Sequence, residues 1–126
     1  MEWEVEFHPA FEAEVLTLER DVRVALIAAA RLLADYGPQL GRPHADTLKG
    51  SKHPNMKELR FEGGDGEWRA AFAFDPKRKA IVLVAGDKSG VSQKRFYRTL
   101  IAKADLRFSE HLESLKSAKE SKRNGP

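Results

Sequence analysis

The chain has 126 residues, of which 41% are hydrophobic and 33% charged, with a formal net charge of +3 and no cysteine. This length suits one domain that can bury a core, and the lack of cysteine excludes disulfides, thiolate metal sites and a cysteine nucleophile. The longest apolar run, residues 24–30, is too short to cross a bilayer, and the acidic N-terminus lacks the features of a signal peptide. We therefore expect a globular, cytoplasmic protein that does not engage a membrane.

The charges are divided unevenly along the chain. Residues 1–47 hold nine acidic and four basic residues, a net charge of −5, whereas residues 48–126 hold ten acidic and eighteen basic residues, a net charge of +8. A basic half of this kind favours an anionic partner, first nucleic acid and then a membrane surface or an acidic protein. The alternative is a basic surface that only keeps the protein in solution.

The N-terminal part predicts a strand followed by helical structure. Residues 3–7 alternate apolar and acidic side chains, which is typical of a strand with one face buried. Pro9 suits the first turn of a helix, and apolar residues spaced by three or four then follow as far as Leu33. Because Asp21 is suited to cap a helix, this segment is either one helix or a helix pair joined near residues 19–21.

Glycine and proline mark the end of the helical segment. Gly37 fits a left-handed C-terminal cap, and Pro38 prevents the helix from continuing. Residues 38–55 contain several glycines and prolines and no regular spacing of apolar residues, so we expect them to form a loop.

Three strands are predicted next, at residues 56–61, 67–74 and 80–86. A glycine-rich turn joins the first two strands, and an Asp-Pro turn at residues 75–79 joins the second to the third. Such short turns make the three strands an antiparallel meander. The third strand is almost entirely apolar, as expected of a central strand buried on both faces. In the second strand, alternation places Trp68, Ala70, Phe72 and Phe74 inward and Arg69, Ala71 and Ala73 outward.

A polar, basic loop is expected at residues 87–95, followed by an amphipathic helix from about Thr99. Residues 118–126 have little apolar content and are expected to be a flexible basic tail after a single domain at 1–117. The order of elements predicts an α+β fold: an N-terminal strand, a helix pair, a three-stranded antiparallel meander and a C-terminal helix, with the helices packed on the sheet.

The sequence offers little for metal or nucleophilic chemistry. None of the four histidines, His8, His44, His53 and His111, is spaced from a second histidine or a carboxylate as in a known metal motif. No serine lies in the sequence context of a nucleophile elbow. We therefore expect neither a metal nor a cofactor.

Two arginines of the meander are predicted to lie side by side. Arg60 and Arg69 fall on the face opposite Leu59 and Phe72, in adjacent strands that share one turn, and Glu58 falls on the same face. Like charges at this distance repel unless an anion compensates them. The group is therefore either an anion-binding site or a salt bridge of Glu58 with an arginine on a solvated face.

Further basic residues lie in the segments before and after the meander. Cations interleaved with aromatic rings suit RNA, because cations bind phosphates and rings stack on bases. Phe96 is better explained as part of the core, whereas Tyr97 has a polar tip and is a site candidate. The residues expected to bind RNA are Lys49, Lys52, His53, Lys57, Lys94, Arg95 and Arg98, and Lys88 follows the last strand.

The segments MKELRF, EWRAAFAFD, AIVLVAGDKSG and FYRTLIAKAD, in this order and spacing, resemble the RelE/HigB/ParE toxin superfamily of type II toxin–antitoxin systems. The resemblance is closest to the HigB-like, phage-derived branch and covers residues 3–112. It implies a RelE-like, microbial-RNase-type fold. It also implies a toxin that acts as a ribosome-dependent mRNA endonuclease (an mRNA interferase) and inhibits translation, using metal-independent chemistry.

The resemblance further implies a cognate antitoxin, commonly a helix-turn-helix DNA-binding protein, with the ribosome and mRNA as the other partners. In this chemistry a ribose 2′-oxygen attacks the adjacent phosphate, which requires a base, cations for the phosphate charge and an acid for the leaving oxygen. Two alternatives stay open: a gyrase-inhibiting, ParE-like toxin, and a non-catalytic nucleic-acid-binding domain.

By the resemblance, Arg69 matches a phosphate-binding arginine at the start of the second meander strand. Lys88 matches a basic residue after the last strand, and Tyr97 matches a polar residue shortly after it. Glu58 and Arg60 lie where relatives place Lys or Glu, and the general base stays open among Glu58, His53 and Lys57. The chain departs from relatives in lacking a doubled lysine after the central strand and a proline in the FYRTLIAKAD segment.

Overall fold

The computed structural model describes the backbone of residues 2–124 and the side chains of residues 2–119. The strands are β1 (Val5–Phe7), β2 (Ala45–Thr47), β3 (Lys57–Gly63), β4 (Gly66–Phe74) and β5 (Ala80–Asp87). The helices are α1 (Pro9–Val15), α2 (Arg20–Tyr36), the short 3-10 helix η1 (Gly37–Gln39) and α3 (Gln93–Asn124).

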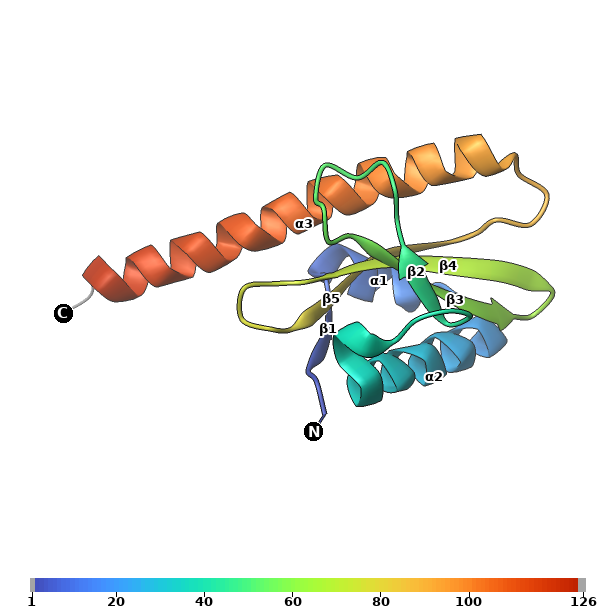
Figure 1. The fold of residues 1–126 in the computed structure, drawn as a ribbon, viewed down its shortest axis with the longest axis horizontal. Helices are drawn as coiled ribbons and strands as arrows, with labels where there is room; N and C mark the ends of the chain where they lie inside the picture. Colours follow the sequence, from blue (N-terminus) through green and yellow to red (C-terminus); the bar gives the residue numbers. More distant parts are fainter. Residues whose placement is uncertain (1, 125–126) are drawn as a thin grey trace.

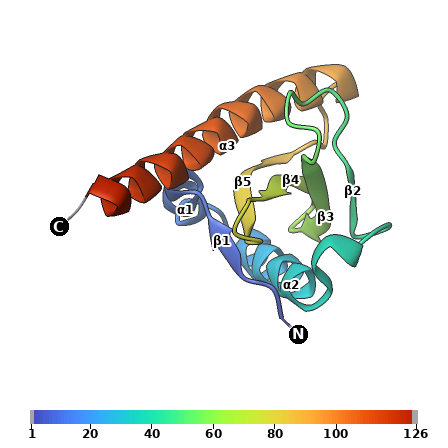
Figure 2. The same ribbon diagram turned by 60° about the vertical axis from the view of Figure 1, so that its left-hand side comes forward.

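A single five-stranded sheet in the order β1-β5-β4-β3-β2 organises the chain. After β1 the chain passes through the helices to the opposite edge of the sheet, and β2, β3, β4 and β5 then follow as antiparallel neighbours. This path brings β5 back beside β1, with which it forms the parallel pair. Figures 1 and 2 show α3 lying across one face of the sheet and α2 along the other. This arrangement confirms the predicted α+β fold with its N-terminal strand, helix pair, three-stranded meander and C-terminal helix.

The two faces of the sheet carry separate cores. On the α2 face, Phe11, Leu26 and Leu33 pack against Phe72 and Val82. On the α3 face, residues of the sheet pack against a stripe of α3 residues spaced by four, namely Phe96, Leu100, Ala104 and Phe108. Because both faces are covered, β5 is buried along most of its length, as its apolar sequence predicts.

The helix pair is separated by residues 16–19. The cap of α2 is Glu19 rather than the expected Asp21, which lies in the first turn of the helix. At the other end, Gly37 has a φ of +57°, and a side chain there would collide with the indole ring of Trp3. Glycine is therefore required both by the backbone conformation and by the close approach of Trp3.

Three predictions about the elements were wrong. Residues 38–55 are not all loop, because Ala45–Thr47 pair with β3 as the edge strand β2. Ala71 and Ala73 do not face solvent: both are fully buried, since their small side chains let α3 pack closely on the sheet. Finally, α3 begins at Gln93 rather than near Thr99, so residues 93–95 of the expected loop belong to its first turn.

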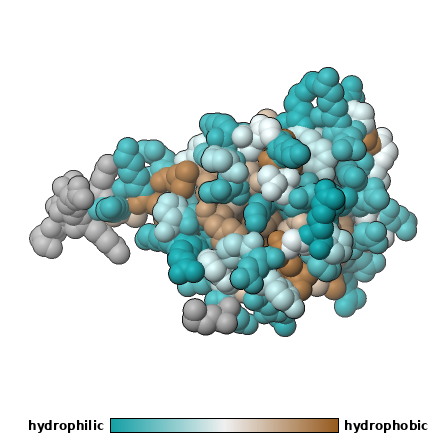
Figure 3. Space-filling model, viewed as in Figure 1, coloured by the Kyte–Doolittle hydropathy of each residue, from teal (hydrophilic) through white to brown (hydrophobic). Residues whose placement is uncertain are grey.

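At its C-terminal end α3 runs on past the sheet (Figure 1). The backbone of residues 118–124 is helical, and residues 125–126 of the expected tail lie outside the described residues. The domain limits 1–117 and the flexibility of the tail stay predictions. Figure 3 shows apolar surface on the projecting part of α3, where Leu112, Leu115 and Ala118 line a groove beside Pro76. Within residues 2–124, no helix is long and apolar enough to span a membrane.

Candidate functional site

The predicted cluster of charged residues exists and is centred on Glu58. In the β3–β4 ladder Arg60 lies directly opposite Arg69, and Glu58 lies opposite the buried Ala71. Alternation along each strand therefore puts Glu58, Arg60 and Arg69 on the α3 face of the sheet, as the sequence predicted. Tyr97, in the first turns of α3, completes the group from above.

Glu58 is 4% exposed, and one of its oxygens receives most of the contacts in the site. The Tyr97 hydroxyl donates a hydrogen bond of 2.7 Å to Glu58 Oε1. The Nε atoms of Arg69 and Arg60 lie 3.3 Å and 3.8 Å from the same oxygen. A buried carboxylate needs such partners, because burial without them would strongly disfavour its charge.

Burial and the hydrogen bond to Glu58 raise the pKa of Tyr97 above its ordinary value. Both influences favour the neutral phenol over the phenolate, since a phenolate beside a carboxylate would be repelled. Tyr97 is thus held as a proton-bearing group at neutral pH, in contact with the carboxylate.

The two arginines are incompletely satisfied. Arg60 Nε and Arg69 Nε are buried and make no hydrogen bond among the described residues, although both lie within 4 Å of Glu58 Oε1. Arg69 is held in place by a 2.9 Å bond from Nη1 to the Trp68 carbonyl. A buried donor without an acceptor costs about 1–3 kcal/mol, so the pair of guanidinium groups is prepared to accept a further anion.

The edge strand β2 contributes a residue that the sequence analysis missed. Asp46 Oδ2 lies 3.4 Å from Arg60 Nη2 and 2.8 Å from Arg42 Nη2. The hydrogen bond from Arg42 lowers the pKa of Asp46, with further help from the Thr47 backbone N–H. A three-residue strand is too short to show a period-two pattern, so no signal in the sequence pointed to Asp46.

The first turns of α3 and the loop before it bring more cations near the site. Lys94 lies three residues before Tyr97 and shares its side of the helix, whereas Arg95 faces β5. Arg98 is exposed next to Tyr97. Lys88 extends the β4–β5 ladder by one bond, from its N–H to the Glu67 carbonyl, and the described residues show no contact of Lys88 with Glu58.

The structure does not bring His53 and Lys57 into the cluster. His53 contacts Ser109 and stacks edge-on against Phe108, about 16 Å along α3 from Tyr97 at 1.5 Å per residue. Lys57 lies on the α2 face and donates to the Pro38 carbonyl. Of the three candidates for the general base, only Glu58 lies beside the arginines.

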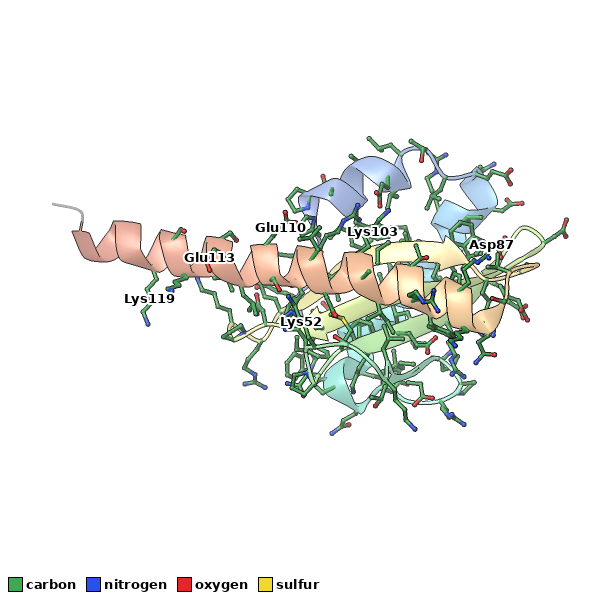
Figure 4. All side chains as sticks on the ribbon, turned by 90° about the horizontal axis from the view of Figure 1, so that it is seen from above. Lys52, Asp87, Lys103, Glu110, Glu113 and Lys119 are labelled. Atoms are coloured by element: carbon green, nitrogen blue, oxygen red, sulfur yellow. The ribbon has the colours of Figure 1, made fainter. Side chains whose placement is uncertain are left out.

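The loop before β3 is fixed to α3 by Asp105, which accepts hydrogen bonds from the Ser51 hydroxyl and the Lys52 backbone N–H. Lys49 and Lys52 are exposed. Figure 4, which looks down on α3, shows Lys52 beside the helix on the side opposite Lys103. Among the described residues, neither lysine side chain contacts Glu58.

A second polar network joins α1, β5 and α3. Arg107, which is 8% exposed, donates 2.8 Å and 2.6 Å hydrogen bonds to the two Glu14 oxygens and a 2.8 Å bond to the Leu83 carbonyl. The hydrogen bonds from Arg107 lower the pKa of Glu14. Because its donors have partners, this network is explained as a structural link between the helices and the sheet. Among the described residues, no group of three histidine or acidic side chains is placed to hold a metal ion.

Comparison with known proteins gives consistent results for sequence and fold. Residues 13–109 match the model of a family described as phage derived protein Gp49-like. Two Mycobacterium tuberculosis H37Rv proteins that are named as the toxins HigB2 and HigB3 are 44% and 43% identical to the chain over 107 and 106 residues. Each alignment covers 84% of this chain, with 53% of HigB2 and 90% of HigB3, so the chain spans about half the length of HigB2.

Two solved structures share the fold. A mutant of the E. coli toxin RelE in the free state superposes with a TM-score of 0.58 at 14% identity, over 82% of this chain and 97% of RelE. A chain of the archaeal RelE–RelB complex from Pyrococcus horikoshii OT3 superposes with a TM-score of 0.52 at 16% identity, over 72% of this chain and 100% of that chain. At such identities the likeness concerns the fold alone.

Proposed function

Because the chain belongs to the phage-derived Gp49-like family, in the HigB-like branch of the RelE/HigB toxin superfamily, we propose that it is the toxin of a type II toxin–antitoxin system. We propose further that it is a ribosome-dependent endoribonuclease that cuts mRNA and inhibits translation. The observation that carries this proposal is the buried Glu58 held between two incompletely satisfied arginines and a neutral tyrosine.

In the proposed reaction the arginines bind the scissile phosphate. The side chains of Arg60 and Arg69 stay 30% and 13% exposed, and an RNA phosphate is proposed to accept hydrogen bonds from the guanidinium N–H groups that it can reach. The negative charge that develops on the phosphate during attack is then stabilised by two fixed cations. Lys88, at the end of β5, is proposed to add a third cation as the substrate arrives.

Glu58 is proposed as the general base. It takes the proton of the ribose 2′-hydroxyl, whose oxygen attacks the phosphorus and closes a 2′,3′-cyclic phosphate, while the bond from phosphorus to the 5′-oxygen breaks. The leaving 5′-oxygen must gain a proton. Tyr97, kept neutral by burial and by Glu58, is the proposed donor. These steps use only side chains of the protein, so the proposed chemistry requires no metal and no cofactor.

The proposed partners follow from the proposed activity. A toxin of this class requires an antitoxin in the same cell, and we expect a helix-turn-helix DNA-binding protein. The archaeal relative of the same fold was solved as a RelE–RelB complex. A substrate of translated mRNA requires the ribosome as well, which would place the protein in the cytoplasm. Lys49, Lys52, Lys94 and Arg98 are proposed to contact RNA, since all four are exposed cations.

The proposal is tested by expressing the chain from an inducible promoter and mapping new mRNA 5′ ends. We expect growth arrest and cuts within translated codons. Arg69→Ala should abolish both effects, whereas Arg31→Ala, an exposed arginine on α2, should leave them intact. A DNA-damage response without mRNA cuts would instead favour a gyrase inhibitor. Salt-dependent RNA binding without cuts, even with ribosomes, would favour a non-catalytic binding domain.

A further inference from the structure

The charged residues of the Glu58 site form a row that continues to the edge of the sheet. Glu58 Oε1 lies between two arginines, with Arg69 Nε at 3.3 Å and Arg60 Nε at 3.8 Å. Arg60 in turn contacts Asp46 on β2, and Asp46 Oδ2 lies 2.8 Å from Arg42 Nη2. Basic and acidic side chains therefore alternate from Arg69 on β4 to Arg42, which lies just before β2.

The exposure of these side chains increases along the row. The Glu58 side chain is almost fully buried, and that of Arg69 is 13% exposed. The side chains of Arg60 and Asp46 are 30% and 29% exposed, and that of Arg42 is 74% exposed. The row therefore leads from the buried carboxylate to solvent, and it reaches solvent at the β2 edge of the sheet.

Two other sides of the site are covered. Tyr97, in the first turns of α3, lies above Glu58 and donates a hydrogen bond to it. The loop that follows the C-terminal end of β2 is fixed to α3 by Asp105, and Figure 2 shows this loop reaching from β2 up to α3. Arg42 precedes the N-terminal end of β2, away from this loop. The β2 edge beside Arg42 is therefore an approach for an extended ligand.

Arg42 is held by one side of its guanidinium group. Its Nε donates a 2.9 Å hydrogen bond to Asp46 Oδ2, and its Nη2 lies 2.8 Å from the same oxygen. Among the described residues, no hydrogen bond or ion pair involves Arg42 Nη1. Arg60 Nη2 lies 3.4 Å from that same Asp46 oxygen, so the two guanidinium groups lie next to each other. Asp46 thus fixes an exposed cation beside a cation of the Glu58 site.

We propose that Arg42 is a substrate-binding residue that holds the RNA phosphate next to the scissile one, and that the RNA enters the site across the β2 edge. This inference rests on the proposed function, in which Arg60 and Arg69 bind the scissile phosphate. The row holds three arginines and two carboxylates, so it keeps a net positive charge after its own pairs have formed. A nucleic-acid backbone carries a phosphate in every nucleotide and follows such neighbouring cations. Asp46 is the positioning residue that keeps Arg42 and Arg60 adjacent.

The first test measures binding of the full chain to a fluorescein-labelled, twelve-nucleotide single-stranded RNA whose 2′-hydroxyls are all methylated, so that it cannot be cut. Affinity is followed by fluorescence anisotropy over a range of salt concentrations. Arg42→Ala should lose at least fivefold in affinity, and the slope of log affinity against log salt should become shallower by about 0.7, the value for one lost phosphate contact. Arg42→Lys should keep the slope, because the charge remains. Arg31→Ala, which removes an exposed arginine of α2, should change neither quantity.

The second test measures cutting by the purified protein in the presence of ribosomes programmed with mRNA. Because the proposed contact of Arg42 is with a phosphate that does not react, Arg42→Ala should raise KM at least fivefold and change kcat by less than about twofold. A fall in kcat with an unchanged KM would overturn the inference.

The two tests separate failure of this inference from failure of the proposed function. If the salt slope and KM of Arg42→Ala equal those of the wild type, the Arg42–Asp46 pair is a surface salt bridge only and the inference is overturned. An equal change of slope in Arg31→Ala would also overturn it. If the wild type cuts no RNA but shows the salt-dependent binding that Arg42→Ala loses, the proposed endonuclease fails while the role of Arg42 in binding RNA stands. A wild type that neither binds nor cuts RNA would overturn both.

Discussion

Replacing Tyr97 with phenylalanine removes a single hydroxyl from the centre of the site. That hydroxyl makes a 2.7 Å hydrogen bond to a carboxylate that is 4% exposed, while the ring packs edge-on against Phe96. Hydrogen bonds to charged groups contribute about 1.5–3 kcal/mol. Since Glu58 keeps its contacts with the arginines and the ring keeps its packing, we expect the free energy of unfolding to fall by about 2 kcal/mol.

The measurement is urea denaturation followed by tryptophan fluorescence. The matched control is Tyr36→Phe, because Tyr36 is the second of the two tyrosines and is 57% exposed. Removal of an exposed hydroxyl should change stability by less than about 0.5 kcal/mol. If Tyr97→Phe changed stability as little as the control, the hydrogen bond from Tyr97 to Glu58 would not stabilise the folded protein.

Three further predictions concern the same geometry. In the Tyr36→Phe background, the pKa of Tyr97, followed by phenolate absorbance, should lie above the ordinary tyrosine value near 10. The native state then holds this proton more tightly than the unfolded chain does. The free energy of unfolding, measured by denaturation, should therefore fall as the pH rises from about 10 through the native pKa. Gly37→Ala should cost about 1–3 kcal/mol and more than Gly90→Ala, because both have positive φ but only Gly37 is packed against a ring. Asp46→Asn should slow RNA cleavage about tenfold, measured as the rate of product formation, because Arg60 loses its charged partner. An unchanged rate would show that Asp46 does not contribute to the site.

The face shared by Glu58, Arg60 and Arg69 was predictable because two independent constraints agree. Period-two alternation decides which side chains share a face, and a glycine-rich turn decides which residues of β3 and β4 lie opposite one another. The ladder indeed places Arg60 opposite Arg69. The positions of Glu58, Arg60 and Arg69 therefore follow from the alternation within β3 and β4 and from the turn that joins them.

What the sequence did not reveal depends on contacts between distant segments. Alanine occurs on both buried and exposed faces of strands, so the sequence alone could not show that Ala71 and Ala73 face a second core. Their burial depends on α3, which packs on them. The role of Asp46 depends on β2, which is only three residues long. Likewise, the exclusion of His53 follows from its docking on α3, 56 residues away from its partner Ser109 along the chain.

We propose that Glu58 and Arg69 act together in cutting RNA. The most direct measurement maps mRNA 5′ ends in a translation reaction containing ribosomes and purified protein, with the wild type, Glu58→Gln, Arg69→Ala and Arg31→Ala compared at equal folded concentration. Removal of a general base typically costs about 10²–10⁴ in rate. We expect a loss of this size for Glu58→Gln, a loss of about 10²–10³ for Arg69→Ala because a cation that stabilises the developing charge is removed, and no loss for Arg31→Ala. Cleavage by Glu58→Gln at the wild-type rate would contradict the proposed role of Glu58 as the general base.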